Sequence, residues 1–176
     1  MKSLFLLRHA KSAWEDGVER DFDRPLNERG QVAARAVGQA MSSTGLRFDH
    51  VLASPAKRVV QTIQEMVKTF GDIDLEYEQR LYLAPTQTLL DIVHGAEDWI
   101  GRLLLIGHNP GFEQLALLLG RPGPIRAQIA EKYPTATLVS ISFPVDHWRD
   151  VAAGAGTLEH LIRPRDLDPR LGPEDF

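Results

Sequence analysis

Short apolar runs alternate along this chain with longer segments in which apolar residues recur every three or four positions. The short runs predict strands at residues 3–7, 50–53, 75–78, 103–106, 137–143 and 157–162. The longer segments predict helices at about residues 28–45, 55–70, 86–94 and 110–119. Asn27 and Ser54 precede the first two of these helices and are the expected N-caps.

Alternation of strand and helix is typical of an α/β protein. We therefore expect a three-layer sandwich, with a mostly parallel central sheet, helices on both faces and one antiparallel edge strand formed late in the chain. Residues 1–162 are expected to form a single domain. Residues 163–176 mix charged side chains with three prolines and predict an irregular tail on the surface.

Composition narrows the possible functions. Among the 176 residues there is no cysteine, which excludes disulfides, a thiolate nucleophile and thiolate-bound metals. A net charge of −4 argues against nucleic-acid binding through a broad basic face. The apolar run Leu4–Leu7 is too short for a secretion signal or a membrane span, so we expect a cytoplasmic protein with no membrane partner.

Reactive and cationic side chains follow three of the predicted strands. They are Arg8, His9, Lys11 and Ser12; Ser54 and Arg58; and His108 and Asn109. Ligands of open α/β sheets bind beyond the carboxyl ends of the strands. These residues should therefore meet at one site, although His9 and His108 lie far apart in the sequence.

The residue types at these strand ends favour phosphoryl transfer. The planar guanidinium of arginine matches the oxygens of a phosphoryl group, and a neutral histidine can attack phosphorus. Arg8 and Arg58 would lower the pKa of a nearby histidine and keep it neutral. A second histidine can donate a hydrogen bond to the phosphoryl group. This set requires no metal or other cofactor.

Four motifs resemble, in order, those of the histidine phosphatase superfamily, which has the phosphoglycerate mutase-like fold. They are Leu7-Arg8-His9-Ala10-Lys11, Arg24-Pro25-Leu26-Asn27-Glu28-Arg29-Gly30, Ser54-Pro55-Ala56-Lys57-Arg58-Val59-Val60-Gln61-Thr62 and Gly107-His108-Asn109-Pro110-Gly111. The resemblance spans residues 4 to about 143, and the last motif is similar to that of the small SixA-like branch. One departure is Ala10, where the family usually has glycine.

The resemblance implies a mechanism. His9 attacks phosphorus and becomes phosphohistidine, which water then hydrolyses to release inorganic phosphate. Arg8, Arg58 and His108 would hold the phosphoryl oxygens during this transfer. Ser54 and Asn109 would support the pocket through hydrogen bonds, and Lys11 and Ser12 would touch phosphate or substrate.

A second departure bears on the substrate. Many superfamily members carry a glutamate that serves as general acid, but residues 80–84 here contain no carboxylate. Asp21 or Asp23, in the loop after the first strand, could replace it. An alkoxide leaving group needs a proton donor, whereas the imidazole of phosphohistidine leaves more easily. A site without a placed acid therefore suits phosphoramidates or esters with good leaving groups, and the SixA-like resemblance implies phosphohistidine on a protein as the substrate. No large insertion encloses the site, so we expect a shallow pocket.

Several alternatives remain open from the sequence. The substrate could be a small phosphorylated metabolite or another phosphoester. The fold could also serve as a phosphate-binding module without catalysis. A metal-dependent hydrolase lacks support, because no H-x-H or H-E-x-x-H pattern is present. A mutase is the weakest alternative, because it needs an enclosed site and the missing acid.

Overall fold

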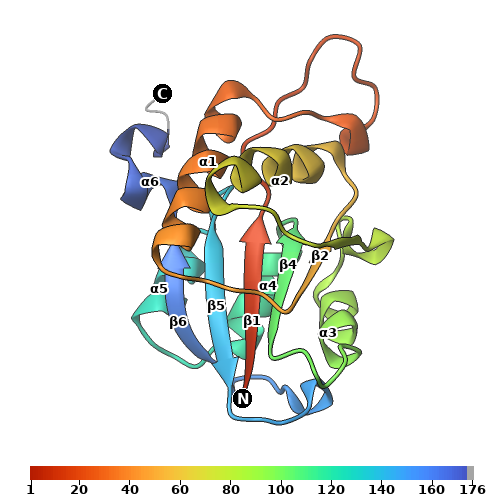
Figure 1. Ribbon diagram of the computed structural model, residues 1–176, viewed down its shortest axis with the longest axis vertical. Helices are drawn as coiled ribbons and strands as arrows, with labels where there is room; N and C mark the ends of the chain where they lie inside the picture. The colour runs from red at the N-terminus through yellow and green to blue at the C-terminus, as the bar shows by residue number, and fades with distance from the viewer. Residues whose placement is uncertain (174–176) are drawn as a thin grey trace.

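A computed structural model describes residues 1–173 and contains a six-stranded sheet in the order β3-β2-β4-β1-β5-β6 (Figure 1). The strands are β1 (Lys2–Arg8), β2 (His50–Ala53), β3 (Glu76–Tyr77), β4 (Arg102–Gly107), β5 (Leu138–Phe143) and β6 (Thr157–Ile162). Strands β1 to β4 pair in parallel, whereas β5 runs antiparallel to both β1 and β6. The expected mixed sheet with an antiparallel edge is thus confirmed.

Helices cover both faces of this sheet (Figure 1). One face carries α1 (Glu28–Ser43) and α2 (Lys57–Phe70), and the other carries α3 (Thr86–His94), α4 (Gly111–Leu119) and α5 (Pro124–Glu131). Successive side chains of a strand point to opposite faces, so Leu4 and Leu6 of β1 join one core while Phe5 and Leu7 join the other. Both layers therefore hold β1 in place, and with it the residues that follow it.

The loop after β1 is fixed against the start of α1. Asn27 is the predicted N-cap, and its side chain accepts a hydrogen bond from the Gly30 N–H at 2.8 Å. The Asn27 N–H in turn donates to the Lys11 carbonyl at 3.0 Å. A Cβ atom on Gly30 would lie 2.1 Å from the same carbonyl oxygen, so only glycine permits this close approach.

The start of α2 differs from the prediction. The helix begins at Lys57 with Ala56 as its N-cap, two residues later than the Ser54-Pro55 sequence suggested. Ser54 is not the cap residue. Its hydroxyl accepts from the Ala56 N–H at 3.3 Å and also contacts His108, so this polar side chain is committed to the site.

The C-terminal segment also differs, because residues 163–173 are partly helical instead of irregular. They contain α6 (Pro164–Leu167) and a 3-10 turn at Pro169–Leu171, each with proline in its first turn. Pro164 is buried, and Arg29 of α1 donates to the Gly172 carbonyl at 2.6 Å. Residues 174–176 of the predicted tail lie outside the described residues.

Helix α5 was not predicted, since it is short and buries Ile129 alone. Among residues 1–173, no helix combines the length and the apolar content that crossing a lipid bilayer requires.

Candidate active site

The carboxyl ends of β1 and β4 bring His9 and His108 together. These strands are parallel neighbours, and Arg8 pairs in register with Gly107, so the two histidines that follow lie side by side. Their ring centroids are 5.3 Å apart. Both side chains are buried, with His9 7% and His108 3% exposed.

Hydrogen bonding fixes the tautomer of His9. Its Nδ1 lies 2.7 Å from the Ala10 carbonyl oxygen, which can only accept, so Nδ1 carries the proton. Nε2 then keeps its lone pair and accepts from Arg58 Nε at 3.3 Å. Burial lowers the pKa of His9 well below its ordinary value, and the charges of Arg8 and Arg58 add to this effect. His9 is therefore a neutral imidazole whose Nε2 lone pair faces a cation.

Arg58 lies in the first turn of α2 and contacts both histidines. It is 3% exposed, and its Nη2 lies 3.3 Å from Nδ1 of His108. Two further bonds hold its far edge, from Nη1 to the Asp21 carbonyl at 2.8 Å and from Nη2 to Asp21 Oδ2 at 3.0 Å. A guanidinium clamped in this way presents its charge in a fixed orientation between the two imidazoles.

His108 is held by Ser54 on its other side. Ser54 Oγ is fully buried and lies 2.7 Å from His108 Nε2. Because Nδ1 of His108 accepts from Arg58, Nε2 carries the proton and donates it to Ser54 Oγ in this arrangement. Burial, followed by the charge of Arg58, lowers the pKa of His108 to about 3. Both imidazoles are thus neutral at pH 7.

Arg8 and Asn109 meet at one carbonyl instead of at the histidines. Arg8 Nη1 donates to the Tyr133 carbonyl at 2.9 Å, and Asn109 Nδ2 donates to the same oxygen at 3.1 Å. Arg8 is still close enough for its charge to lower the pKa of both His9 and His108. Asn109 Oδ1 accepts from the Glu113 N–H at 3.2 Å, so this side chain holds the start of α4.

Lys11 and Ser12 lie in the loop after β1, which bonds to the segment that precedes α1. Ser12 forms a β-bridge with Leu26. Lys11 lines a cavity that Arg8 borders and that neither histidine lines. The structure thus brings Ser54 into contact with the candidate catalytic residues and directs Lys11 toward a separate cavity.

Tyr82 is part of the site, although the sequence analysis did not identify it. Its hydroxyl donates to Asp21 Oδ2 at 2.6 Å, and its ring meets that of His108 edge-on at 5.4 Å. It lies in the segment 80–84, for which the family resemblance raised only the question of a carboxylate. An aromatic residue at that position was the one signal available, and nothing local showed that it would face His108.

Asp21 is an acceptor here and not an acid. Burial acts to raise its pKa, but hydrogen bonds from Tyr82, Arg24 and Arg58 outweigh burial and lower the pKa to about 2. Its carboxylate is therefore ionised at pH 7 and positions Arg58. Asp23 pairs instead with Arg20 at the surface, at 2.7 Å.

Comparisons with known proteins agree with this geometry. A family model described as "Histidine phosphatase superfamily (branch 1)" matches residues 4–82. A Mycobacterium tuberculosis protein without an assigned function is 34% identical over 163 residues, covering 90% of this chain and 100% of the relative. The chain belongs to the histidine phosphatase superfamily.

Solved structures support the same assignment. A candidate phosphohistidine phosphatase SixA from Agrobacterium tumefaciens has a TM-score of 0.76 and 31% identity, covering 93% of this chain and 98% of that one. The protein histidine phosphatase SixA complexed with tungstate has a TM-score of 0.76. At 20% identity, over 94% of this chain and 99% of that one, the second match shows the fold alone. Superfamily membership supports phosphatase activity, which is a hydrolase function.

The histidine phosphatase motifs also contain residues that position others. Thr62 Oγ1 accepts from the Ala10 N–H at 2.9 Å and donates to the Arg58 carbonyl at 2.7 Å. Gln61 Oε1 accepts from the Leu26 N–H at 2.8 Å. These two neighbours thus attach the loops around His9 to α2. Within residues 1–173, no three histidine or acidic side chains are grouped so that they could hold a metal ion.

Proposed function

We propose that this protein is a phosphatase that works through a phosphohistidine intermediate on His9 and acts on phosphohistidine in a protein. The observation that carries the proposal is the state of His9, which is neutral, holds its proton on Nδ1 and directs its Nε2 lone pair at Arg58. Neutral imidazole with an oriented lone pair is the form that attacks phosphorus.

The transfer proceeds in two displacements. His9 Nε2 forms a bond to phosphorus as the bond from phosphorus to the substrate's imidazole breaks. The substrate's imidazole carries a proton on its second ring nitrogen and therefore leaves as neutral imidazole, while His9 keeps its own proton on Nδ1. Arg58 and Arg8 neutralise the charge on the phosphoryl oxygens. Water then attacks phosphorus, the bond to His9 Nε2 breaks and inorganic phosphate leaves. Each step requires positioned positive charge and no metal ion.

His108 assists by exchanging tautomers. When a phosphoryl group binds the Arg58 guanidinium, the hydrogen bond from Arg58 to Nδ1 of His108 is lost. Nδ1 must then carry a proton in order to donate a hydrogen bond to a phosphoryl oxygen. The Ser54 hydroxyl then donates to Nε2, and the imidazole proton resides on Nδ1. The side chain stays neutral throughout, in keeping with the low pKa of His108.

The ionised state of Asp21 supports phosphohistidine as the substrate. The nearest carboxylate to Arg58 belongs to Asp21, whose pKa of about 2 leaves it without a proton to donate at pH 7. An alkoxide would leave slowly from such a site, whereas the imidazole of phosphohistidine is far less basic. The likeness to the Agrobacterium protein supports the same substrate.

A small phosphorylated metabolite is the second candidate. The observation that favours it is the cationic cavity beside Arg8, which is suited to an additional acidic group on a compact substrate. A cavity of this kind does not require the phosphorylated group to belong to a protein.

The test is hydrolysis of a histidine-kinase domain that carries radiolabelled phosphohistidine, with a chelator present. His9→Ala should slow release of inorganic phosphate by at least about 10³-fold, because the nucleophile is lost. His160→Ala is the matched control, since His160 is exposed on β6, and it should retain the wild-type rate. Label should also appear transiently on the wild-type enzyme.

Equal rates of phosphate release for wild type and His9→Ala would overturn the assignment of His9 as the nucleophile. Loss of activity in the chelator would overturn metal independence. Faster hydrolysis of small phosphoesters than of the phosphorylated domain would favour the metabolite.

A further inference from the structure

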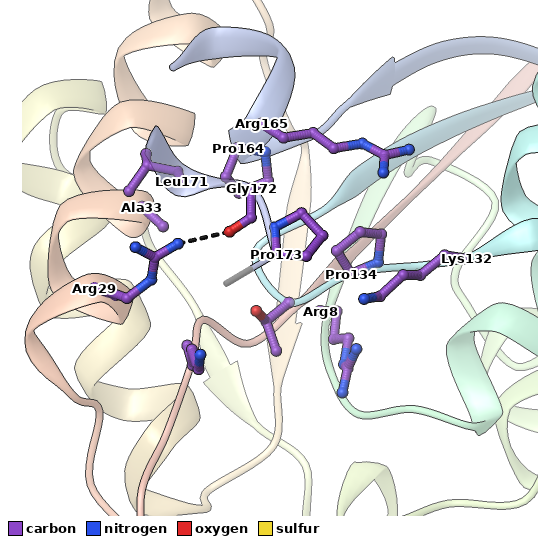
Figure 2. Close-up of a pocket in the computed structure, with 12 residues that line it drawn as sticks. Arg8, Arg29, Ala33, Lys132, Pro134, Pro164, Arg165, Leu171, Gly172 and Pro173 are labelled. Atoms are coloured by element: carbon purple, nitrogen blue, oxygen red, sulfur yellow. Dashed lines mark hydrogen bonds between the residues drawn. The ribbon is translucent and has the colours of Figure 1, made fainter. Parts of the chain in front are cut away.

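A cationic cavity of about 330 Å³ lies between α1, the segment 132–135 before β5 and the C-terminal segment 164–173 (Figure 2). Its lining within residues 1–173 includes no acidic side chain, and the basic residues there are Arg8, Lys11, Arg29, Lys132 and Arg165. Figure 2 shows Arg8, Arg29 and Lys132 reaching the cavity from three different elements. Five basic side chains thus gather at one cavity in a chain whose net charge is −4.

Arg8 forms a wall shared by the cavity and the histidine site. It lines the cavity, and its charge lowers the pKa of both His9 and His108. The histidines themselves do not line the cavity. Arg8 directly precedes His9 in the chain, so a substrate that extends from His9 past Arg8 enters the cavity.

The charge of the cavity is only partly compensated within residues 1–173. In that range, no carboxylate forms an ion pair with Lys132 or Arg165. Lys132 is exposed at the rim, and Arg165 is half-buried. Several cations around one concave surface raise the local concentration of anions.

The walls between these charges are rigid and apolar. Ala33 of α1, Pro134, Pro164 and Pro173 line the cavity, and Pro164 is buried. Arg29 anchors the C-terminal rim through its bond to the Gly172 carbonyl at 2.6 Å. A preformed concave site with a few convergent polar groups has the usual composition of a ligand site.

We propose that this cavity binds a second anionic group of the substrate, a carboxylate or a phosphate, while the phosphoryl group lies against His9. The inference rests on the proposed function, because it assigns a specificity site to that reaction. The second anion belongs either to an acidic residue near phosphohistidine in a protein or to a phosphorylated metabolite. Charge-assisted hydrogen bonds from lysine and arginine would bind both.

The test compares substrates that differ in one anionic group. The first pair is a phosphohistidine peptide with glutamate two residues away and the same peptide with glutamine. The second pair is phosphoserine, which has a carboxylate, and phosphoethanolamine, which has none. KM is measured for each substrate with wild type, Lys132→Ala and Lys132→Glu.

Arg121→Glu is the matched control for Lys132→Glu. It changes the net charge equally, and Arg121 is an exposed residue beyond the end of α4, outside the cavity lining. In wild type, the substrate with the second anion should have the lower KM in at least one pair. Lys132→Glu should reduce that advantage by about three- to tenfold, as expected for a partly exposed charge pair. The KM advantage in Lys132→Ala should lie between those of wild type and Lys132→Glu, and the KM advantage in Arg121→Glu should match that of wild type.

An effect confined to the peptides identifies an acidic protein residue as the second anion, and an effect confined to phosphoserine identifies a metabolite. Identical KM ratios in wild type and Lys132→Glu, with kcat retained, would overturn the cavity proposal alone. If no substrate were hydrolysed, the proposed function would fail. The cavity would then be tested by calorimetric binding of both peptides to His9→Ala, with and without Lys132→Glu. Equal affinities would overturn it.

Discussion

The histidine site and the cationic cavity share Arg8 but are built differently. In the histidine site, the polar side chains of His9, His108 and Arg58 are buried, and each makes a defined hydrogen bond. The cavity has longer, more exposed basic side chains, contributed by segments far apart in the sequence. Chemistry at phosphorus needs fixed atoms, whereas recognition of an additional anion tolerates adjustable ones. Substitutions should therefore affect kcat at the first site and KM at the second.

The largest effect we expect in this comparison comes from Arg58→Lys. Lysine keeps the charge but cannot reach Nε2 of His9, Nδ1 of His108 and Asp21 together as the guanidinium does. We expect kcat/KM to fall by about 10²-fold on every substrate, as when a preorganised donor is lost. Steady-state kinetics will measure this.

Arg126→Lys is the control for this substitution, since Arg126 donates to the Leu117 carbonyl outside the site. A loss of less than threefold in Arg58→Lys would show that charge alone suffices and would remove the distinction between the two regions.

Asp21→Asn should have an intermediate effect. The carboxylate orients Arg58, so its loss should lower kcat/KM by about tenfold. The pKa of Asp21 is lowered from 3.8 to about 2, so its ionised form stabilises the fold above pH 4. That contribution is lost as the pH falls through about 2.

Thermal unfolding can follow this pH dependence. The difference in Tm between wild type and Asp21→Asn should be complete at pH 7 and should shrink between pH 4 and pH 2. Asp23→Asn, whose partner Arg20 lies at the surface, should leave kcat/KM unchanged. A Tm difference independent of pH would contradict the assigned role of the Asp21 charge.

Ser54→Ala should have a smaller effect, on oxyanion affinity. Without the hydroxyl, Nε2 of His108 loses the donor that allows Nδ1 to hold a proton. We expect tungstate affinity to fall by about fivefold, the usual scale for one hydrogen bond. Calorimetry in two buffers should show that wild type takes up no proton on binding at pH 7.

Ser42→Ala, an exposed change on α1, serves as the control. Uptake of one proton per bound tungstate would show instead that His108 becomes an imidazolium. That outcome would contradict the proposed exchange of tautomers.

The smallest effect is expected at the cavity rim, for Arg29→Ala. This substitution removes the bond to the Gly172 carbonyl, which should cost about 1 kcal/mol of stability. Proteolysis of the C-terminal segment should become faster, while Arg47→Ala, which loses only a bond to its neighbouring residue, should not change it. Unchanged proteolysis would mean that other contacts hold this rim.

The sequence alone was enough to predict which candidate site residues lie at strand ends. Because parallel strands align their carboxyl ends, His9 and His108 could be placed together without knowledge of any contact. Periodicity likewise located the helices that cover the sheet, and Asn27 was recognised as a cap from its type and position.

The features that the sequence missed depend on contacts between distant loops. Tyr82 reaches Asp21 across 61 positions, and nothing near either residue indicates this bond. Ser54 was expected to support the pocket through hydrogen bonds, but its type also suggested the N-cap of α2, and the sequence could not show that its hydroxyl contacts His108. The cavity was not predicted because Lys132 and Arg165 come to line the same cavity as Arg8 only when the chain folds.

The hydroxyl of Thr62 has a consequence for motion. It joins the peptide that follows His9 to the carbonyl of Arg58, so the loop that carries His9 and the start of α2 are attached to each other as well as to the sheet. When thermal fluctuations shift the helix, we expect the loop to shift with it. The separation between His9 Nε2 and the Arg58 guanidinium should then persist through displacements that would change it if each were supported independently.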